Sequence, residues 1–255
     1  MDTAPPLLRL QALDKRYPGG TQALAGLTLE VGVREFVALL GPSGCGKSTV
    51  LRLIAGLERP DAGSLQWSGA VPTLGYVFQE PTLMPWATVA DNVYLPLRLQ
   101  GRTRGEAAAA IDAMLARVGL ADFAHAYPRE LSGGMKMRVS IARALVTRPG
   151  LLLMDEPFAA LDELTRQQLG EDLLAIQAEQ GFAVVFVTHS VHESAYLADR
   201  VLVMSPRPGR VAAESRIDEA RPRGEAYRLS ARYDAHRVAV SRALRDAMAS
   251  ASDHA

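Results

Sequence analysis

Residues 41–48 read GPSGCGKS, and this stretch constrains the fold more than any other part of the sequence. It fits the pattern of a glycine, any four residues, then Gly-Lys-Ser or Gly-Lys-Thr. The apolar run EFVALL precedes it at 35–40, and the helix pattern STVLRLIAGL follows at 48–57. A strand, a glycine-rich loop and a helix start in this order turn backbone N–H groups and the positive end of the helix dipole toward phosphate. The sequence therefore predicts a phosphate-binding loop that holds a nucleotide.

The side chains of this loop have expected roles. Lys47 should neutralise the β- and γ-phosphates, and the Ser48 hydroxyl should ligate Mg²⁺. Cys45, the only cysteine of the chain, has two interpretations that the sequence leaves open. It is either a reactive thiol, activated by the helix start and Lys47, or a small filler in a tight loop. The expected nucleotide contacts within the loop are Gly41, Pro42, Ser43, Gly44, Cys45, Gly46, Lys47, Ser48 and Thr49.

The rest of the chain predicts an α/β fold with a parallel sheet. Apolar runs at 151–154, 183–187 and 200–204 alternate with helix patterns at about 163–180 and 190–198. Such alternation is typical of parallel strands joined by crossover helices. Earlier in the chain, short strand patterns fill residues 7–40, and two more follow within 62–78. The pattern of residues 82–148 predicts mainly helices, and Thr103 and Glu106 form a capping box within it.

Polar residues follow three of the predicted strands. Asp155 and Glu156 end one strand, His189 follows another, and Gln79 follows a third. Ligands of open α/β sheets gather at the carboxyl ends of the strands. We therefore expect Asp155 to hold Mg²⁺ through water, Glu156 to orient or deprotonate a water, and His189 to contact the γ-phosphate. The expected metal ligands are Ser48, Gln79 and Asp155. The alternative for Asp155 and Glu156 is a strand that simply ends in an acidic turn. The alternative for His189 is a histidine that only forms structural hydrogen bonds.

A second phosphate-binding pattern occurs at 131–138, which reads LSGGMKMR. Ser132 can cap a helix, and Gly133 and Gly134 let backbone N–H groups approach a ligand closely. One chain thus carries two segments that favour anions, about ninety residues apart.

Taken together, these motifs resemble the nucleotide-binding subunit of an ATP-binding cassette (ABC) transporter. The resemblance implies a P-loop NTPase (RecA-like) core with a parallel sheet, an N-terminal antiparallel β subdomain and an inserted helical subdomain. It implies one ABC ATPase domain over 5–245, the helical subdomain at 82–148, and a short Arg-rich helical tail at 206–255.

The resemblance also assigns residues to a shared site. Two copies would meet head to tail, so that the signature residues Leu131, Ser132, Gly133 and Gly134 of one copy close over the γ-phosphate held by the other. Tyr17 would stack on adenine, and Asp162 would belong to the loop that links the two sites. Met135 departs from the family pattern, which usually has glutamine there, and this leaves any role of that amide in doubt.

The implied activity is ATP hydrolysis that uses ATP and Mg²⁺ and drives transmembrane permease subunits, with a solute-binding protein as an indirect partner. Segments LMPWATVADNV at 83–93, EPFAALDELTR at 156–166 and ADRVLVMSPRPGRV at 198–211 are similar to importers of the nitrate, sulfonate and taurine group. The expected location is the cytoplasmic face of the inner membrane, reached through the permease. The alternatives are an ABC-type ATPase that works without a permease, as in DNA repair or translation, and a P-loop kinase.

Composition limits the partners. Lys plus Arg and Asp plus Glu both number 28, so the formal net charge is zero, which argues against wrapping nucleic acid. No secretory signal and no run of about 18 apolar residues is evident, so a membrane role should come through a partner. A single cysteine fits a reducing compartment. Residues 206–246 hold ten arginines against six acids. They predict a solvated helical surface or, alternatively, an electrostatic contact with a partner or with lipid headgroups.

Overall fold

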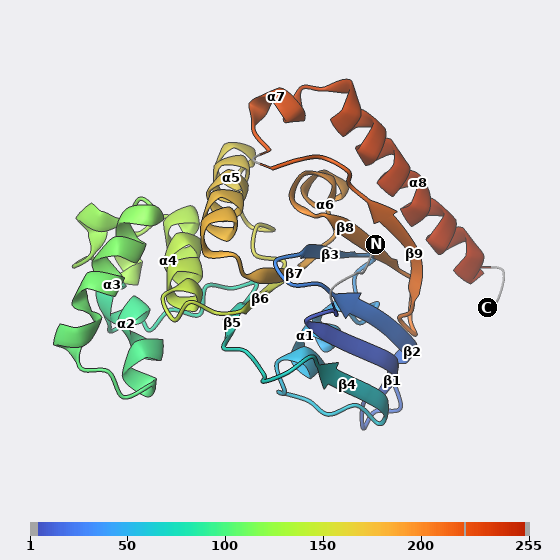
Figure 1. Ribbon diagram of the computed structural model, residues 1–255, viewed down its shortest axis with the longest axis horizontal. Coiled ribbons are helices and arrows are strands. Elements are labelled where there is room, and N and C mark those ends of the chain that lie inside the picture. Colours follow the sequence, from blue (N-terminus) through green and yellow to red (C-terminus); the bar gives the residue numbers. More distant parts are fainter. Residues whose placement is uncertain (1–4, 222, 253–255) are drawn as a thin grey trace. The chain divides into compact units, whose positions relative to one another are not determined.

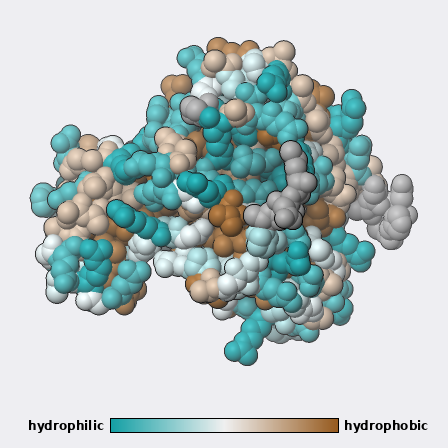
Figure 2. Space-filling view, in the orientation of Figure 1, coloured by the Kyte–Doolittle hydropathy of each residue, from teal (hydrophilic) through white to brown (hydrophobic). Residues whose placement is uncertain are grey.

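The computed structural model describes residues 5–221 and 223–252, with side chains through 249, and its elements up to residue 204 follow the predicted order (Figure 1). No helix within these residues is long and apolar enough to cross a membrane. Hydrophilic side chains predominate on the face shown in Figure 2. The strands are β1 (Leu8–Arg16), β2 (Gln22–Val31), β3 (Phe36–Leu40), β4 (Ala62–Trp67), β5 (Leu74–Val77), β6 (Leu151–Asp155), β7 (Ala183–Thr188), β8 (Arg200–Met204) and β9 (Val211–Arg216). The α-helices are α1 (Lys47–Ile54), α2 (Val89–Leu99), α3 (Arg104–Arg117), α4 (Gly133–Leu145), α5 (Glu163–Gln180), α6 (Val191–Leu197), α7 (Glu225–Arg228) and α8 (Ala231–Ser252).

The chain divides into two units. The first comprises Met1–Val71 and Ala183–Ala255, and the second comprises Pro72–Phe182. The second unit contains the predicted helical segment 82–148 together with β5, β6 and α5. The predicted domain boundaries 5–245 and 82–148 remain predictions.

The first unit contains a sheet in which β3 pairs in parallel with both β7 and β8, and β9 pairs antiparallel with β8. All five residues of β3 and all six of β7 are buried. Continuous apolar strands of this kind belong to parallel sheets that are covered on both faces. A separate antiparallel sheet has the order β2-β1-β4. Along β1 and β2, buried residues alternate in part with more exposed ones.

The second unit consists of helices and of strands β5 and β6, which pair in parallel. Its long helices begin where side chains accept hydrogen bonds from otherwise unpaired N–H groups. Thr88 caps α2, and Thr103 forms the predicted capping box with Glu106 at α3. Ser132 caps α4 as predicted, and Asp162 caps α5. The predicted helix at about 163–180 is confirmed as α5.

The prediction of a helical tail at 206–255 is wrong for its first part. Residues 211–216 form β9, which extends the sheet at β8, and helix α8 begins only at Ala231. Half of the β9 residues are exposed. An edge strand of this kind needs no apolar face of its own, because backbone pairing with β8 holds it in place.

The expectation of solvated arginines is also wrong for Arg223, whose residue is 3% exposed. Its guanidinium donates hydrogen bonds to the carbonyl oxygens of Tyr196 and Ala198, at 2.9 and 2.7 Å, at the end of α6. Carbonyls at a helix C-terminus lack partners within the helix and carry partial negative charge, so a buried cation is stabilised there. Burial lowers the pKa of Arg223, and the nearby Asp199 carboxylate opposes that shift.

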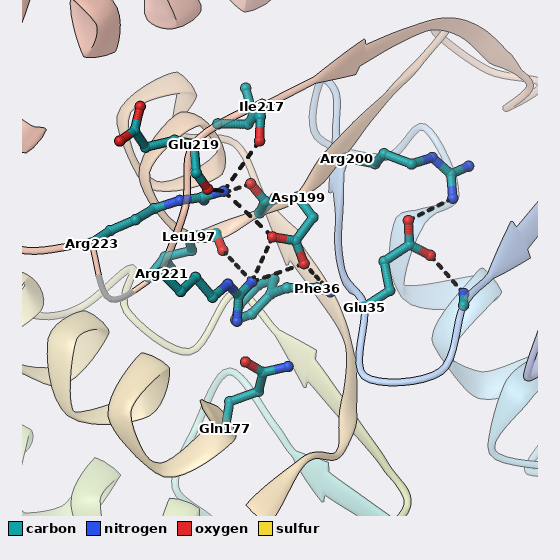
Figure 3. Close-up of polar contacts among 12 residues, drawn as sticks. Glu35, Phe36, Gln177, Leu197, Asp199, Arg200, Ile217, Glu219, Arg221 and Arg223 are labelled. Carbon is teal, nitrogen blue, oxygen red and sulfur yellow. Dashed lines mark hydrogen bonds and ion pairs between the residues drawn. The ribbon is translucent and has the colours of Figure 1, made fainter. Parts of the chain in front are cut away.

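Asp199 connects this cation to the strand that leads into the glycine-rich loop. Its carboxylate accepts hydrogen bonds from Arg221 at 2.9 and 3.0 Å and from the Phe36 N–H at 2.9 Å (Figure 3). Phe36 is the first residue of β3. The tail segment thereby fixes both the end of α6 and the start of β3.

We predict that Arg223→Met will lower the free energy of unfolding by about 2–3 kcal/mol, because the carbonyls at the end of α6 lose a charged donor. Urea unfolding measures this difference. Arg242→Met, which changes an exposed arginine of α8, should stay within about 0.5 kcal/mol of the wild type. Equal stability of the two variants would contradict the role given to Arg223.

Candidate nucleotide site

The predicted phosphate loop connects β3, which ends at Leu40, to α1, which begins at Lys47. Gly44 and Gly46 have positive φ angles of 76° and 102°, and glycine adopts this region without steric cost. A Cβ at Gly46 would also lie only 2.8 Å from the carbonyl oxygen of Ala23. The spacing of the glycines in the motif thus follows from the path of the backbone.

The Lys47 side chain turns back into this loop. Its Nζ donates hydrogen bonds to the carbonyl oxygens of Gly41 at 2.8 Å and Pro42 at 2.9 Å, and the residue is 4% exposed. An ammonium group so placed is close to any phosphate that enters the loop. Phosphate oxygens form shorter and stronger bonds to it than neutral carbonyl oxygens do.

His189 follows the strand beside the one that carries the loop. Leu40 and Thr188 are paired in the β3–β7 ladder, so Gly41 and His189 leave the sheet side by side at its carboxyl edge. The Thr188 hydroxyl accepts from the Ser190 N–H at 2.9 Å and donates to the Glu193 carboxylate at 2.5 Å. These bonds fix the turn that holds His189, which is exposed.

Tyr17 lies close to the loop through its hydroxyl group. The hydroxyl donates to the two carboxylate oxygens of Glu58, each at 3.0 Å, and its oxygen is 3.1 Å from the Thr49 hydroxyl. The half-buried ring is therefore fixed at one end. Its stacking on adenine remains a prediction. The contact with Glu58 has no signal in the sequence, because the two residues are far apart in the chain and fit no motif.

The second unit brings Gln79 and the two acidic residues together. Val77 of β5 pairs with Met154 of β6 in parallel register, and Gln79 and Glu156 each follow two residues later. Glu156 has a φ of 44°, which costs energy for a residue with a side chain and is typical of functional sites. Gln79 is exposed, whereas Asp155 and Glu156 are partly buried.

The signature segment begins α4 in the same unit. The Ser132 hydroxyl oxygen accepts from the Met135 N–H at 3.2 Å, and Leu131 before it is buried. A Cβ at Gly134 would lie 2.6 Å from Thr165 Cγ2, whereas one at Gly133 would meet no atom within 4 Å. The N–H groups at the start of α4 are those that a helix leaves without internal partners.

Asp162 has a local structural role in the same place. Its carboxylate accepts a hydrogen bond from the Thr165 N–H at 3.0 Å, and this bond lowers the pKa of Asp162. Thr165 is the residue that packs against Gly134. The start of α5 and the start of the signature helix are thus held together by this capped turn.

The donor set that was expected for Mg²⁺ fits this ion by its chemistry. Ser48 supplies a hydroxyl in the first turn of α1, and Asp155 supplies a carboxylate at the end of β6. Mg²⁺ prefers oxygen ligands and is commonly held by one or two protein groups, substrate phosphates and water. Accordingly, the described residues contain no cluster of three or more His, Cys, Asp or Glu that could hold a metal by itself.

Comparison with known proteins identifies the family. The protein-family model described as ABC transporter matches residues 24–159. The chain is 49% identical to the taurine import ATP-binding protein TauB of Chromobacterium violaceum, over 77% of each chain. It is 45% identical to the aliphatic sulfonates import ATP-binding protein SsuB 1 of Rhizobium johnstonii, over 87% of this chain and 81% of that protein. A solved dimeric ATP-binding cassette in a post-hydrolysis state, bound to ADP and Pi, matches with a TM-score of 0.75 and 31% identity, over 84% of this chain and all of that one.

The chain therefore belongs to the ATP-binding family of ABC transporters. It is an ABC-type ATPase with the α/β fold of P-loop NTPases, and the predicted family, fold and enzyme class are confirmed. The structure places each predicted site residue at a loop, a strand end, a helix cap or the first turn of a helix. The roles assigned to the individual residues remain predictions.

The structure favours the filler interpretation of Cys45, which is 1% exposed. We predict that a maleimide will modify Cys45 at least about tenfold more slowly in the folded protein than in urea, since labelling requires local opening. The rate of thiol loss, with glutathione as a reference thiol, measures this. Rapid and complete labelling of the folded protein would support the reactive-thiol interpretation instead.

Proposed function

We propose that this ATPase is the energy-coupling subunit of an importer for a small solute, an anion such as nitrate, a sulfonate or taurine. The observation that carries the proposal is the likeness to two import ATP-binding proteins, for taurine and for aliphatic sulfonates, at 49% and 45% identity. Permease subunits would select the solute together with a solute-binding protein. The ATPase would then lie on the cytoplasmic face of the inner membrane, held there by the permease.

The proposed chemistry assigns each group one task. The N–H groups of residues 41–49 bind the phosphates, and Lys47 offsets their charge. Ser48, Asp155 and Gln79 would hold Mg²⁺, which would offset the negative charge of the phosphates. Glu156 orients or deprotonates the attacking water, and His189 contacts the γ-phosphate.

A second copy of the chain is the proposed partner at the signature segment. Ser132 and Gly133 are exposed at the start of α4, where unpaired N–H groups favour a phosphate. The solved cassette with the same fold is a dimer bound to ADP and Pi. Both observations support a head-to-tail dimer in which each chain supplies a phosphate loop to one site and a signature segment to the other.

The second unit offers a surface that suits the permease. A groove there is lined mainly by apolar and aromatic side chains that include Tyr76, Phe78, Leu95 and Leu99. Leu99 is 78% exposed, and Trp86, elsewhere in the same unit, is 77% exposed. Contiguous apolar surface that is exposed in this way is typical of interaction sites.

Solute uptake and membrane association test the proposal. Deletion of the gene should abolish uptake of labelled taurine, an alkanesulfonate or nitrate, and the intact chain, but not its Lys47→Ala variant, should restore it. The tagged protein should also co-purify with a permease from detergent-solubilised membranes. Unchanged uptake of all three solutes would contradict the assignment to this importer group. Recovery without any membrane protein would favour an ABC-type ATPase that acts without a permease.

We predict that Lys47→Ala will lower ATP hydrolysis by at least about a hundredfold, because the phosphates lose their nearest positive charge. A phosphate-release assay at saturating MgATP measures this. Arg98→Ala removes the same charge from an exposed position in α2 and should retain wild-type turnover. Full activity of Lys47→Ala would contradict the site assignment.

Glu156→Gln should separate nucleotide binding from hydrolysis. The amide is nearly isosteric, so ATP still binds, while the loss of the carboxylate slows hydrolysis by about 10²–10⁴. Dimers that cannot hydrolyse ATP should then accumulate, which gel filtration with ATP would detect as a shift from monomer to dimer. Glu163→Gln, a nearby exposed carboxylate, is the matched control. Wild-type hydrolysis by Glu156→Gln would rule out this residue as the base.

A further inference from the structure

The turn between β8 and β9, residues 205–210, packs against the phosphate loop. Arg207 Nε donates a hydrogen bond to the carbonyl oxygen of Gly44 at 3.1 Å. Two residues later, the Gly209 N–H donates to the Ala23 carbonyl at 2.8 Å, and the Gly209 carbonyl accepts from the Ala25 N–H at 3.2 Å. The turn is thus attached both to the loop and to strand β2.

The approach of this turn is close enough to require glycine. A Cβ at Gly209 would lie 2.0 Å from the carbonyl oxygen of Cys45. The turn is also closed on itself, since the Ser205 N–H donates to the Arg210 carbonyl at 2.9 Å and the Ser205 hydroxyl donates to the Pro208 carbonyl at 3.2 Å. A closed turn presents Arg207 from a fixed backbone.

The bond from Arg207 determines how one peptide group of the loop is oriented. In a trans peptide the C=O and the following N–H point in opposite directions. The Gly44 carbonyl faces Arg207, and the Cys45 N–H on the other side of the same peptide donates toward the Pro42 carbonyl across the loop, at 3.4 Å. That N–H therefore points to the side of the loop from which Lys47 also bonds the Pro42 carbonyl.

We propose that Arg207 is a positioning residue for phosphate binding. It holds the peptide between Gly44 and Cys45 with its N–H turned into the loop, where a phosphate of a nucleoside di- or triphosphate would accept it. A charged donor on the carbonyl also polarises the peptide and strengthens its N–H as a donor. This inference rests on the proposed assignment of residues 41–49 to the nucleotide phosphates.

The proposal predicts a particular kinetic pattern. Arg207 acts on a peptide that binds the ground state and the transition state alike, so its loss should raise KM for MgATP and leave kcat nearly unchanged. A merely structural role would instead lower the stability of the protein and the fraction of active enzyme. Because Arg207 is exposed, its replacement should leave the urea unfolding midpoint close to that of the wild type.

The test measures the Kd of a fluorescent ADP with Mg²⁺, and KM and kcat for ATP, in the full chain. Arg207→Ala should raise Kd and KM about three- to tenfold, the effect of one ordinary hydrogen bond. Arg207→Lys, which keeps a cationic donor, should recover part of the loss. Arg210→Ala removes the same charge from an exposed side chain of the same turn, and should stay within twofold of the wild type.

Gly209→Ala provides a second route to the same peptide. Its Cβ must displace the Cys45 carbonyl, so this variant should bind ADP at least as weakly as Arg207→Ala. Wild-type affinity of Arg207→Ala, or equal losses in the Arg207→Ala and Arg210→Ala variants, would overturn the proposal. Lys47→Ala tests separately whether residues 41–49 bind the nucleotide phosphates at all. If it also binds ADP like the wild type, then the assignment of the loop itself is wrong.

Discussion

The structure depends on how the carbonyl groups of one glycine-rich loop are satisfied. Lys47 bonds the carbonyls of Gly41 and Pro42 from within, and Arg207 bonds the carbonyl of Gly44 from outside. A loop built to bind phosphate must expose several backbone donors to one point, which few backbone conformations allow. The positive φ angles of Gly44 and Gly46 are the local condition for this arrangement, and the packed turn at 205–210 supports it from behind.

The same sheet links the loop to the rest of the first unit. Its central strand β3 delivers the loop, and its neighbour β7 delivers His189. Asp199 bonds the first residue of β3, and Arg223 bonds the end of the helix that follows His189. The buried cation therefore supports both segments, and its burial is offset by helix-terminal carbonyls and by a carboxylate.

Features set by neighbouring residues could be predicted from the sequence, whereas those set by distant ones could not. The loop, the caps Thr103 and Ser132, and the apolar strands depend on local patterns, and each was found where it was expected. Strand β9 was missed because an edge strand takes its conformation from pairing with β8 rather than from its own sequence. The burial of Arg223 was missed because its acceptors lie 25 and 27 residues away. The unusual backbone of Glu156 likewise has no local signal in the sequence.

The central claim is that each chain contributes its two phosphate-binding segments to two different sites, and mixed dimers test it most directly. One chain would carry both Lys47→Ala and Ser132→Arg, its partner would be wild type, and two different affinity tags would isolate the mixed pair. If the sites are shared, each contains one damaged segment, and ATP hydrolysis should fall to the background of the double variant alone. Half of the wild-type turnover in the purified mixed dimer would show that a single chain completes its own site and would contradict the account.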